Sequence, residues 1–274
     1  MCISTVILTL DEEVNLPGAL QSLAGHCNDV VVFDSFSSDS TCAIAATFGA
    51  RVVQRKFDDY ASQRSAALAL EFRHPWVLMI DADERMSPSL WEEMEGSVKS
   101  AGDDVCIFRM RRKDIVFGKW LKRSSGYPTW FGRLLRRGRV RIEREVNEQY
   151  LTDGAVAHLS GHLLHYPMNR GIAHWVDRHN QYSTMEARRL MVERQGPISL
   201  AALFSRDPTE RRKTLKAISY RLPGRPLLVF CYLYLFRLGF LDGAAGYRYC
   251  RLRAFYEHLI DIKVDELAAA NSPS

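Results

Sequence analysis

The chain has 274 residues, enough for one large domain or for a domain with an appendage. Its charged and apolar fractions are ordinary for a globular protein, and its net charge of +5 favours anionic partners without choosing among them. Six scattered cysteines, without a Cys-x-x-Cys pair, exclude a disulfide framework and indicate a reducing compartment. The chain begins directly with a strand pattern and shows no signal peptide, so we expect a cytoplasmic protein.

The first hundred residues alternate between strand and helix patterns. The predicted strands are 3–8, 30–33, 51–54 and 76–80, and the predicted helices are 12–24, 42–48, 60–71 and 88–98. Strands separated by helices of this length imply right-handed crossovers and a mostly parallel sheet. We therefore expect an α/β fold with a Rossmann-like sheet flanked by helices.

The pattern changes from residue 105 onward. Residues 107–111 alternate as a strand does, and short strand-like pieces follow at 133–135 and 163–166. A helix is predicted over 171–194, with aromatic residues on one side. The expected organisation is one main domain over 1–200, divided into the halves 1–104 and 105–200.

A basic and apolar tail is expected over residues 201–274. Residues 206–225 are rich in arginine and lysine, and the apolar run 227–236 follows. A run of this length cannot cross a bilayer, which requires about 20 residues. A basic, aromatic-rich amphipathic segment suits the interface of an anionic membrane. The alternative is a terminal helical hairpin packed on the domain.

The predicted strand 76–80 ends abruptly in acids. Asp81 and Asp83 follow an uninterrupted apolar run, which is typical of a strand buried on both faces. Ligands of open α/β sheets bind at the carboxyl ends of such strands, where carboxylate oxygens suit Mg²⁺ or Mn²⁺. The alternative is that Asp83 or Ser87 caps the following helix.

Other strand ends carry polar residues that are expected to share the same crevice. These are Thr9 and Glu12 after the first strand, Asp34 after the second, and Arg64 on the helix that follows the third. The chain has no glycine-rich phosphate loop, so a dinucleotide or P-loop site is not expected. Acids and a cation at strand ends suit a nucleotide whose phosphates are neutralised through a metal ion.

Four motifs in this order resemble the opening half of family 2 glycosyltransferases. They are residues 3–16 (ISTVILTLDEEVNL), 34–41 (DSFSSDST), 63–68 (QRSAAL) and 81–84 (DADE). The branch that the chain resembles contains lipopolysaccharide-core β-glucosyltransferases and exopolysaccharide-assembly glycosyltransferases. The resemblance is strongest over about residues 1–100 and looser to about residue 190. It implies a GT-A domain over 1–200, with a nucleotide-sugar-binding half at 1–104 and an acceptor-binding half at 105–200. It also implies an inverting transfer from a nucleotide-sugar.

The resemblance also implies roles for the residues at the strand ends. Asp34 contacts the donor base, and Thr9 and Glu12 line the nucleotide pocket. Asp81 and Asp83 form the D-x-D pair, which we assign to the metal site. Within this pair, Asp83 ligates the metal ion and Asp81 also holds the ribose or the sugar. Arg64 replaces the usual lysine beside the base or phosphates, which keeps the charge but changes the hydrogen-bond geometry.

The proton acceptor is expected outside the D-x-D pair, because that pair sits on the leaving-group side. Relatives commonly show Val-His-Glu where this chain reads Val146-Asn147-Glu148. Glu148 matches their glutamate and is the expected base, with Glu145 in reserve. The alternative is a surface acid paired with a neighbouring arginine.

Acceptor contacts are expected from the segment that precedes the base. Tyr127 and Trp130 offer rings that stack on a sugar, and Arg133 offers a guanidinium for an acceptor phosphate. Trp130 as a core residue is the alternative. His165 resembles a late histidine that completes the metal shell in many GT-A enzymes; the alternative is a structural histidine.

These observations predict a glycosyltransferase that uses Mg²⁺ or Mn²⁺ to move glucose or a similar hexose from a UDP-sugar. The expected acceptor is a lipid-linked glycan or lipopolysaccharide core, at the inner face of the cell membrane. A sugar nucleotidyltransferase is the first alternative, although its glycine-rich basic loop is absent. A catalytically silent membrane-surface scaffold is the second. Nucleic acid is not an expected partner, because no recognition motif is present.

Overall fold

The structure is a computed structural model that describes residues 2–143, 149–194 and 224–270. Between the last two ranges it describes a few isolated positions, namely 202, 204, 205, 207, 210, 211, 214 and 218. The chain forms two compact units. Unit 1 consists of Met1–Ile115 and Gly126–Arg170, and unit 2 consists of Val116–Ser125 and Gly171–Ser274.

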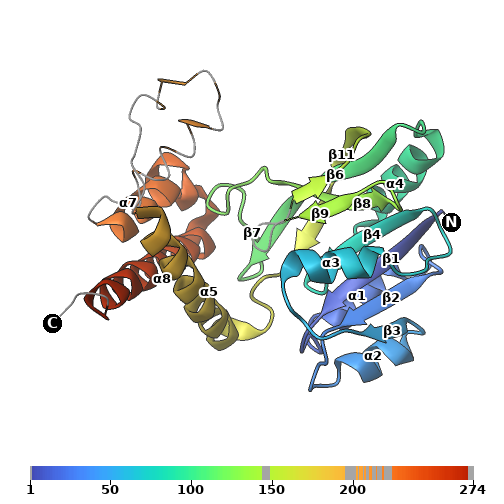
Figure 1. Cartoon of the computed structure of the whole chain (residues 1–274), viewed down its shortest axis with the longest axis horizontal. Helices are drawn as coiled ribbons and strands as arrows, with labels where there is room; N and C mark the ends of the chain where they lie inside the picture. Colours follow the sequence, from blue (N-terminus) through green and yellow to red (C-terminus); the bar gives the residue numbers. More distant parts are fainter. Residues whose placement is uncertain are drawn as a thin grey trace. The chain divides into compact units, whose positions relative to one another are not determined.

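The N-terminal part of unit 1 is an α/β layer whose first four strands are parallel (Figure 1). Its elements are β1 (Ile3–Thr9), α1 (Leu16–Leu23), β2 (Val30–Asp34), α2 (Thr41–Thr47), β3 (Arg51–Gln54), α3 (Tyr60–Leu68), β4 (Trp76–Asp81), β5 (Glu84–Arg85) and α4 (Pro88–Ser100). β1 lies between β2 and β4, and β3 extends the sheet beyond β2. The strands and helices predicted over this part are confirmed, with ends that differ by a few residues.

The second part of unit 1 extends the same sheet with β6 (Val105–Val116), β8 (Trp130–Arg136) and β11 (Ala155–His165). β9 (Arg141–Glu143) and β10 (Gln149–Leu151) form a separate two-stranded antiparallel sheet. β8 is antiparallel to both β4 and β6, while β11 is parallel to β6. β6 and β11 therefore run in the direction of β4, and their carboxyl ends reach the edge where Asp81 lies.

Two apolar clusters enclose the sheet from opposite faces. The side chains of α1, α2 and α4 pack on one face, where Ile7 of β1 is buried. The side chains of α3 pack on the other face, where Val6 of β1 is buried. Successive residues of β1 thus point to opposite faces, and both faces are covered by helices, which explains the apolar run at residues 6–8 within the strand.

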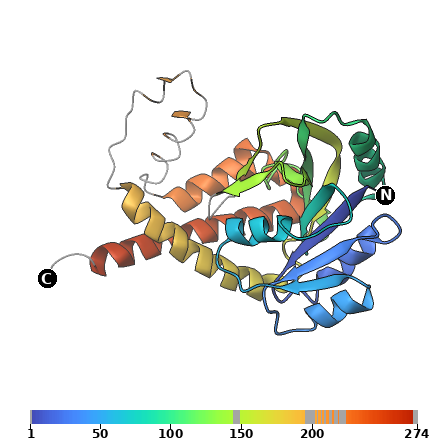
Figure 2. The same cartoon turned by 45° about the vertical axis from the view of Figure 1, so that its right-hand side comes forward.

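Unit 2 is mainly helical and also contains the short strand β7 (Lys119–Trp120). Its helices are α5 (Gly171–Arg194), α7 (Arg225–Cys231), the π-helix η2 (Tyr232–Phe236), the 3₁₀ helix η3 (Gly239–Asp242) and α8 (Gly243–Ala270). α5 and α7 both pack on α8, and Figure 2 shows the long helices α5 and α8 side by side. The predicted helix over 171–194 is confirmed.

Two features differ from the expectation. β11 spans Ala155–His165, although only 163–166 was predicted as a strand, because its register shifts between His158 and His162 and breaks the alternation. α5 belongs to unit 2, whereas a domain boundary at residue 200 would place it with the sheet. The physical reason is that Ala187 and Leu190 of α5 are buried against α8.

Candidate active site

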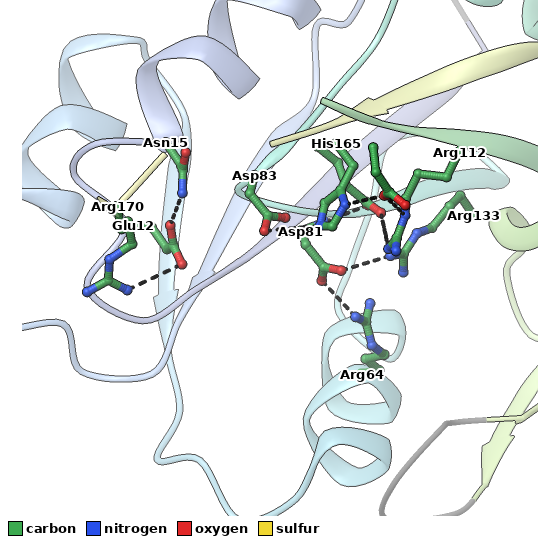
Figure 3. A network of polar contacts seen from close by, with 11 residues as sticks. Glu12, Asn15, Arg64, Asp81, Asp83, Arg112, Arg133, His165 and Arg170 are labelled. Atoms are coloured by element: carbon green, nitrogen blue, oxygen red, sulfur yellow. Dashed lines mark hydrogen bonds and ion pairs between the residues drawn. The ribbon is translucent and has the colours of Figure 1, made fainter. Parts of the chain in front are cut away.

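The carboxyl ends of three neighbouring strands lie level at one edge of the sheet. Thr9 pairs with Asp34, and Leu8 pairs with Asp81, across the parallel ladders of β1. Figure 3 shows the acids and arginines that gather at this edge, where open α/β sheets bind their ligands. The structure therefore brings together residues that the sequence places after separate strands.

Asp34 is fully buried and accepts four hydrogen bonds. The donors are the hydroxyl of Thr9 at 2.9 Å, the amide of Gln54 at 3.0 Å, and both the backbone amide and the hydroxyl of Ser37. Burial raises the pKa of this carboxyl, but the donors outweigh burial, and the pKa lies below its usual value. Asp34 thus holds the loop after β2, and its contact with a donor base stays a prediction.

We expect Asp34→Asn to lower the free energy of unfolding by about 1–3 kcal/mol near neutral pH, because an amide cannot accept all four hydrogen bonds. The folded pKa of Asp34 lies below its ordinary value of 3.8. Its ionised form therefore stabilises the protein above that pH, and this stabilisation is lost as the pH falls through the folded pKa. Urea midpoints should differ at neutral pH and converge in acid. A constant difference would contradict this assignment.

The loops after β1 and β2 hold each other in a strained conformation. Asp11 and Phe36 have left-handed backbone angles, with φ of 53° and 63°. The backbone amide of Asp11 donates to the Ser37 hydroxyl at 2.8 Å, and the Asp11 carboxylate accepts from the Ser38 amide at 2.7 Å. Such strain persists only where the surroundings fix it, and it concentrates at functional sites.

Glu12 is fixed in the loop after β1. Its backbone amide donates to the Thr41 hydroxyl at 2.8 Å, and its carboxylate accepts from the Asn15 amide at 2.8 Å. Nη1 of Arg170 lies 3.5 Å from the other carboxylate oxygen (Figure 3). Arg170 ends the second part of unit 1, so nothing in the local sequence pointed to this ion pair. Glu12 is thereby oriented at the edge where it was expected.

Asp81 lies between two arginines, one on each carboxylate oxygen. Nη2 of Arg64 is 2.7 Å from Oδ1, and Nη2 of Arg133 is 2.8 Å from Oδ2. Burial favours the protonated form, but the two guanidinium groups outweigh burial and hold the pKa of Asp81 well below its usual range. Asp81 is therefore an anion with both oxygens engaged. Its role as a metal ligand beside Asp83 stays a prediction.

Glu84 is a fully buried carboxylate that we had quoted only as part of a motif. Its Oε1 accepts from Arg133 at 2.7 Å and lies 3.8 Å from Arg112. Its Oε2 accepts from the backbone amide of Asp81 at 3.0 Å. Glu84 therefore positions both the backbone of Asp81 and the arginine that neutralises it. The sequence carries one signal for this role, namely that a third acid, Glu84, directly follows the D-x-D pair.

Asp83 faces His165 from the end of β11. Oδ2 of Asp83 lies 3.3 Å from Nε2 of His165, and Nδ1 of the same ring lies 2.7 Å from Oδ1 of Asp114. Burial lowers the pKa of His165, but the two carboxylates outweigh burial and raise it to about 9. The position between the carboxylates of Asp83 and Asp114 therefore favours a positive charge. Asp114 orients the ring in the way that outer-shell carboxylates orient metal-binding histidines.

The residues present fit a divalent metal ion held by two protein side chains. Within the described ranges, no group of three or more His, Cys, Asp or Glu side chains is arranged to hold a metal ion. Mg²⁺ is commonly held by one or two carboxylates together with substrate phosphates. Asp83 supplies an oxygen and His165 a nitrogen, so a nucleotide diphosphate would have to supply further ligands.

The three residues expected to bind the acceptor occupy different environments. Trp130 is partly exposed and stands edge-on to His158, with Arg111 5.3 Å from its ring centre. The Tyr127 hydroxyl is 2.9 Å from a ring nitrogen of His162. Arg133 is buried beneath Asp81 and Glu84, so its guanidinium is not placed to receive an acceptor phosphate.

The expected base, Glu148, and its reserve, Glu145, lie outside the described residues. The strands on either side are described: β9 and β10 pair, with Glu143 opposite Gln149. The Ser65 hydroxyl, next to Arg64 on α3, donates to the carbonyl of Ile142 in β9 at 3.3 Å. β9 is thus anchored beside α3, the helix that supplies Arg64.

The family is decided by sequence comparison. The model of the family described as "Glycosyl transferase family 2" matches residues 4–158, which is more than half of the chain. This chain belongs to glycosyltransferase family 2. The fold class expected for the family, a GT-A type α/β sheet with a helical C-terminal extension, is confirmed by the strand order described above.

Two curated glycosyltransferases illustrate the similarity. A lipopolysaccharide core biosynthesis glycosyltransferase, LpsC, of Rhizobium meliloti is 30% identical over 196 residues, covering 68% of this chain and 70% of that protein. An uncharacterized glycosyltransferase of Rickettsia typhi is 29% identical over 207 residues, covering 69% of this chain and 68% of that protein.

Among solved structures, the chain is similar to glucosyl-3-phosphoglycerate synthase from Mycobacterium tuberculosis in complex with Mn²⁺, UDP and glucosyl-3-phosphoglycerate. The sequence identity is 23% and the TM-score is 0.36. The match covers 41% of this chain and 44% of that one.

Proposed function

We propose that this family 2 member is a metal-dependent inverting glycosyltransferase. It moves glucose or a similar hexose from a UDP-sugar to a lipid-linked glycan or lipopolysaccharide core at the cytoplasmic face of the membrane. The observation that carries the proposal is the arrangement at the sheet edge. Asp83 faces His165 there, and Asp81 lies between Arg64 and Arg133.

The donor side of the site supplies charge and orientation. Asp83 and His165 would hold Mg²⁺ or Mn²⁺, which when bound stabilises negative charge on the leaving diphosphate. Arg64 and Arg133 hold the carboxylate of Asp81 ionised and in one orientation, so that it can accept hydrogen bonds from ribose or sugar hydroxyls. Thr9, Glu12 and Asp34 fix the loops around the nucleotide.

The acceptor side must supply a base and a surface for the sugar. Glu148 takes the proton of the attacking hydroxyl, and Glu145 is the reserve. This assignment is supported by the match of Glu148 to the glutamate of relatives and by the anchoring of β9, which ends at Glu143, beside α3. The rings of Trp130 and Tyr127 offer stacking faces to the acceptor. A role in lipopolysaccharide core assembly is supported by the name of the Rhizobium meliloti relative.

Calorimetry and a donor screen test this function together. UDP should bind in the presence of Mn²⁺ or Mg²⁺ and lose most of its affinity in a chelator. Among UDP-, GDP- and dTDP-sugars, a UDP-hexose should release its nucleotide diphosphate when acceptor is present. Release of pyrophosphate from UTP and a sugar phosphate would instead identify a nucleotidyltransferase. Absence of both reactions, with lipid binding retained, would identify a silent scaffold.

Glu148→Gln is expected to lower the rate of transfer about a hundredfold or more, because the amide cannot accept the proton of the attacking hydroxyl. The affinity for UDP and metal should stay unchanged, since this residue is assigned to the acceptor side. Single-turnover transfer and UDP calorimetry measure the two properties separately. Glu145→Gln serves as the matched variant from the same segment, and a larger loss there would move the base to Glu145.

A further inference from the structure

Unit 2 exposes a continuous apolar face along α7, η2 and η3. Phe236 is 79% exposed and Leu227 is 67% exposed, which is unusual for side chains of this size. We call this face the hairpin surface. Its side chains are those of Leu227, Leu228, Tyr232, Leu235, Phe236, Leu238, Phe240 and Leu241. The positions in α7 and η2 recur at helical spacing, so they form one stripe along the length of the helix.

The opposite face of the same helix is firmly packed, so the exposure is not the result of a loose end. α7 packs on α8, and its first residue, Arg225, forms a buried ion pair with Glu257 of α8. Arg253 lies 3.2 Å from the other carboxylate oxygen of Glu257. The hairpin is therefore a fixed element of unit 2 that presents its apolar side outward.

The exposed charge that residues 225–256 carry is positive. They contain five arginines and a single acid, Asp242. Arg225 and Arg253 pair with the buried Glu257, whereas Arg248 and Arg251 are exposed. Asp242 is buried and accepts hydrogen bonds from the backbone amides of Lys122, Arg123 and Ser124. These bonds remove its charge from the surface. They also tie to the hairpin the segment 116–125, which carries three basic residues and no acid.

The dimensions suit a bilayer interface. Among the described residues, no single helix is long and apolar enough to cross a membrane. Arg225–Phe236 and Gly239–Ala270 pass that test only as a pair, bent by 73°. The first of them is about 18 Å long, well short of the roughly 30 Å hydrocarbon core. A stripe along such a helix, with basic residues beside it, is the pattern of a helix that lies flat in the interface.

We propose that the hairpin surface docks on an anionic lipid bilayer, with α7 and η2 lying flat among the headgroups and the apolar side chains of η3 inserted below them. Arg248 and Arg251, both exposed on α8, contact lipid phosphates. The proposal rests on the proposed function, because an acceptor anchored in lipid requires the enzyme at that surface. It goes further by assigning the contact to the hairpin rather than to the basic run 206–225.

A second copy of the chain fits this surface less well. A two-fold dimer would place the same patch of both chains face to face. The exposed arginines would then lie opposite arginines, without an exposed acid in residues 225–256 to neutralise them. Anionic headgroups supply that missing charge, about 1 kcal/mol for each arginine near the surface, or roughly fivefold in binding.

Flotation of the full-length protein with lipid vesicles tests the proposal. The wild type should bind vesicles of phosphatidylcholine with phosphatidylglycerol at physiological salt, and should not bind phosphatidylcholine alone. The double variant Phe236→Ser, Leu241→Ser should lose at least about tenfold in binding, as expected when two large apolar side chains no longer insert. Arg248→Ala with Arg251→Ala should lose roughly 25-fold, and high salt should remove that difference.

Met185→Ser is the matched control, since Met185 is a half-exposed apolar side chain of α5 outside the hairpin surface. It should bind vesicles as the wild type does. Binding by the Phe236 double variant equal to wild type would overturn the proposal. The proposal would also be overturned if the wild type were a dimer that persists at high salt and the double variant were a monomer. UDP calorimetry without vesicles shows that each variant is folded, and it separates failure of docking from failure of the proposed enzyme activity.

Discussion

Replacing Asp83 by asparagine is expected to abolish the metal-dependent part of UDP binding and to lower kcat/KM by about 10²–10³, the range seen when one charge-stabilising group is removed. Asp83 supplies the main carboxylate that we assign to the ion, and its Oδ2 lies 3.3 Å from the Nε2 of His165 that we assign to the ion. An amide of the same shape keeps the packing but loses the charge that holds a divalent cation.

Asp114→Asn is the matched control for this experiment. Asp114 contacts His165 at 2.7 Å on the far ring nitrogen, so it orients the ring without being assigned to the ion. Its loss should cost only about 10–100-fold in metal affinity, as for outer-shell carboxylates elsewhere. Calorimetry of UDP with Mn²⁺ and with a chelator measures both variants. The assignment would be refuted if the affinity for UDP were the same with Mn²⁺ and with a chelator, in both the wild type and Asp83→Asn.

The second large effect concerns stability. Arg133→Met should lower the free energy of unfolding by about 3–5 kcal/mol, because it leaves the fully buried carboxylate of Glu84 without its main partner. The nearest remaining guanidinium, that of Arg112, is 3.8 Å away. Urea denaturation followed by tryptophan fluorescence measures the loss as a lower midpoint.

Two further variants isolate the buried charge as the cause. Adding Glu84→Gln to Arg133→Met should recover part of the stability, since the uncompensated charge is then absent. Arg139→Met removes a pair with Asp153 in which both side chains are exposed, and it should cost less than about 1 kcal/mol. Equal losses for the two arginines, or no recovery in the double variant, would contradict this interpretation of the buried pair.

The elements of the first hundred residues were predictable because local patterns and tertiary packing agree there. Apolar runs became strands buried on both faces, and helical spacing became helices on the two sides of the sheet. β11 was mostly missed because a register shift removes the alternation that marks a strand. The assignment of α5 to unit 2 depends on its packing against α8, which the pattern of a single helix does not encode.

The candidate site divides in the same way. Thr9, Asp34 and Asp81 follow successive parallel strands, so their convergence could be predicted from topology alone. The partners that set their chemistry come from distant segments. Arg133 from β8, which was expected to face an acceptor, instead neutralises Asp81 and Glu84 beneath the site.

By itself, the sequence determined the family, the α/β class and the positions of the D-x-D pair, because these depend on local motifs and on periodicity. Only the tertiary structure decided what each charge faces. Asp81 is held between two arginines, and Asp83 faces a histidine from β11. Asp242 is buried and hydrogen-bonded to backbone amides, so it adds no negative charge to the hairpin surface. The physical reason is that electrostatic roles depend on distances of a few ångströms between residues far apart in the chain, which local patterns do not specify.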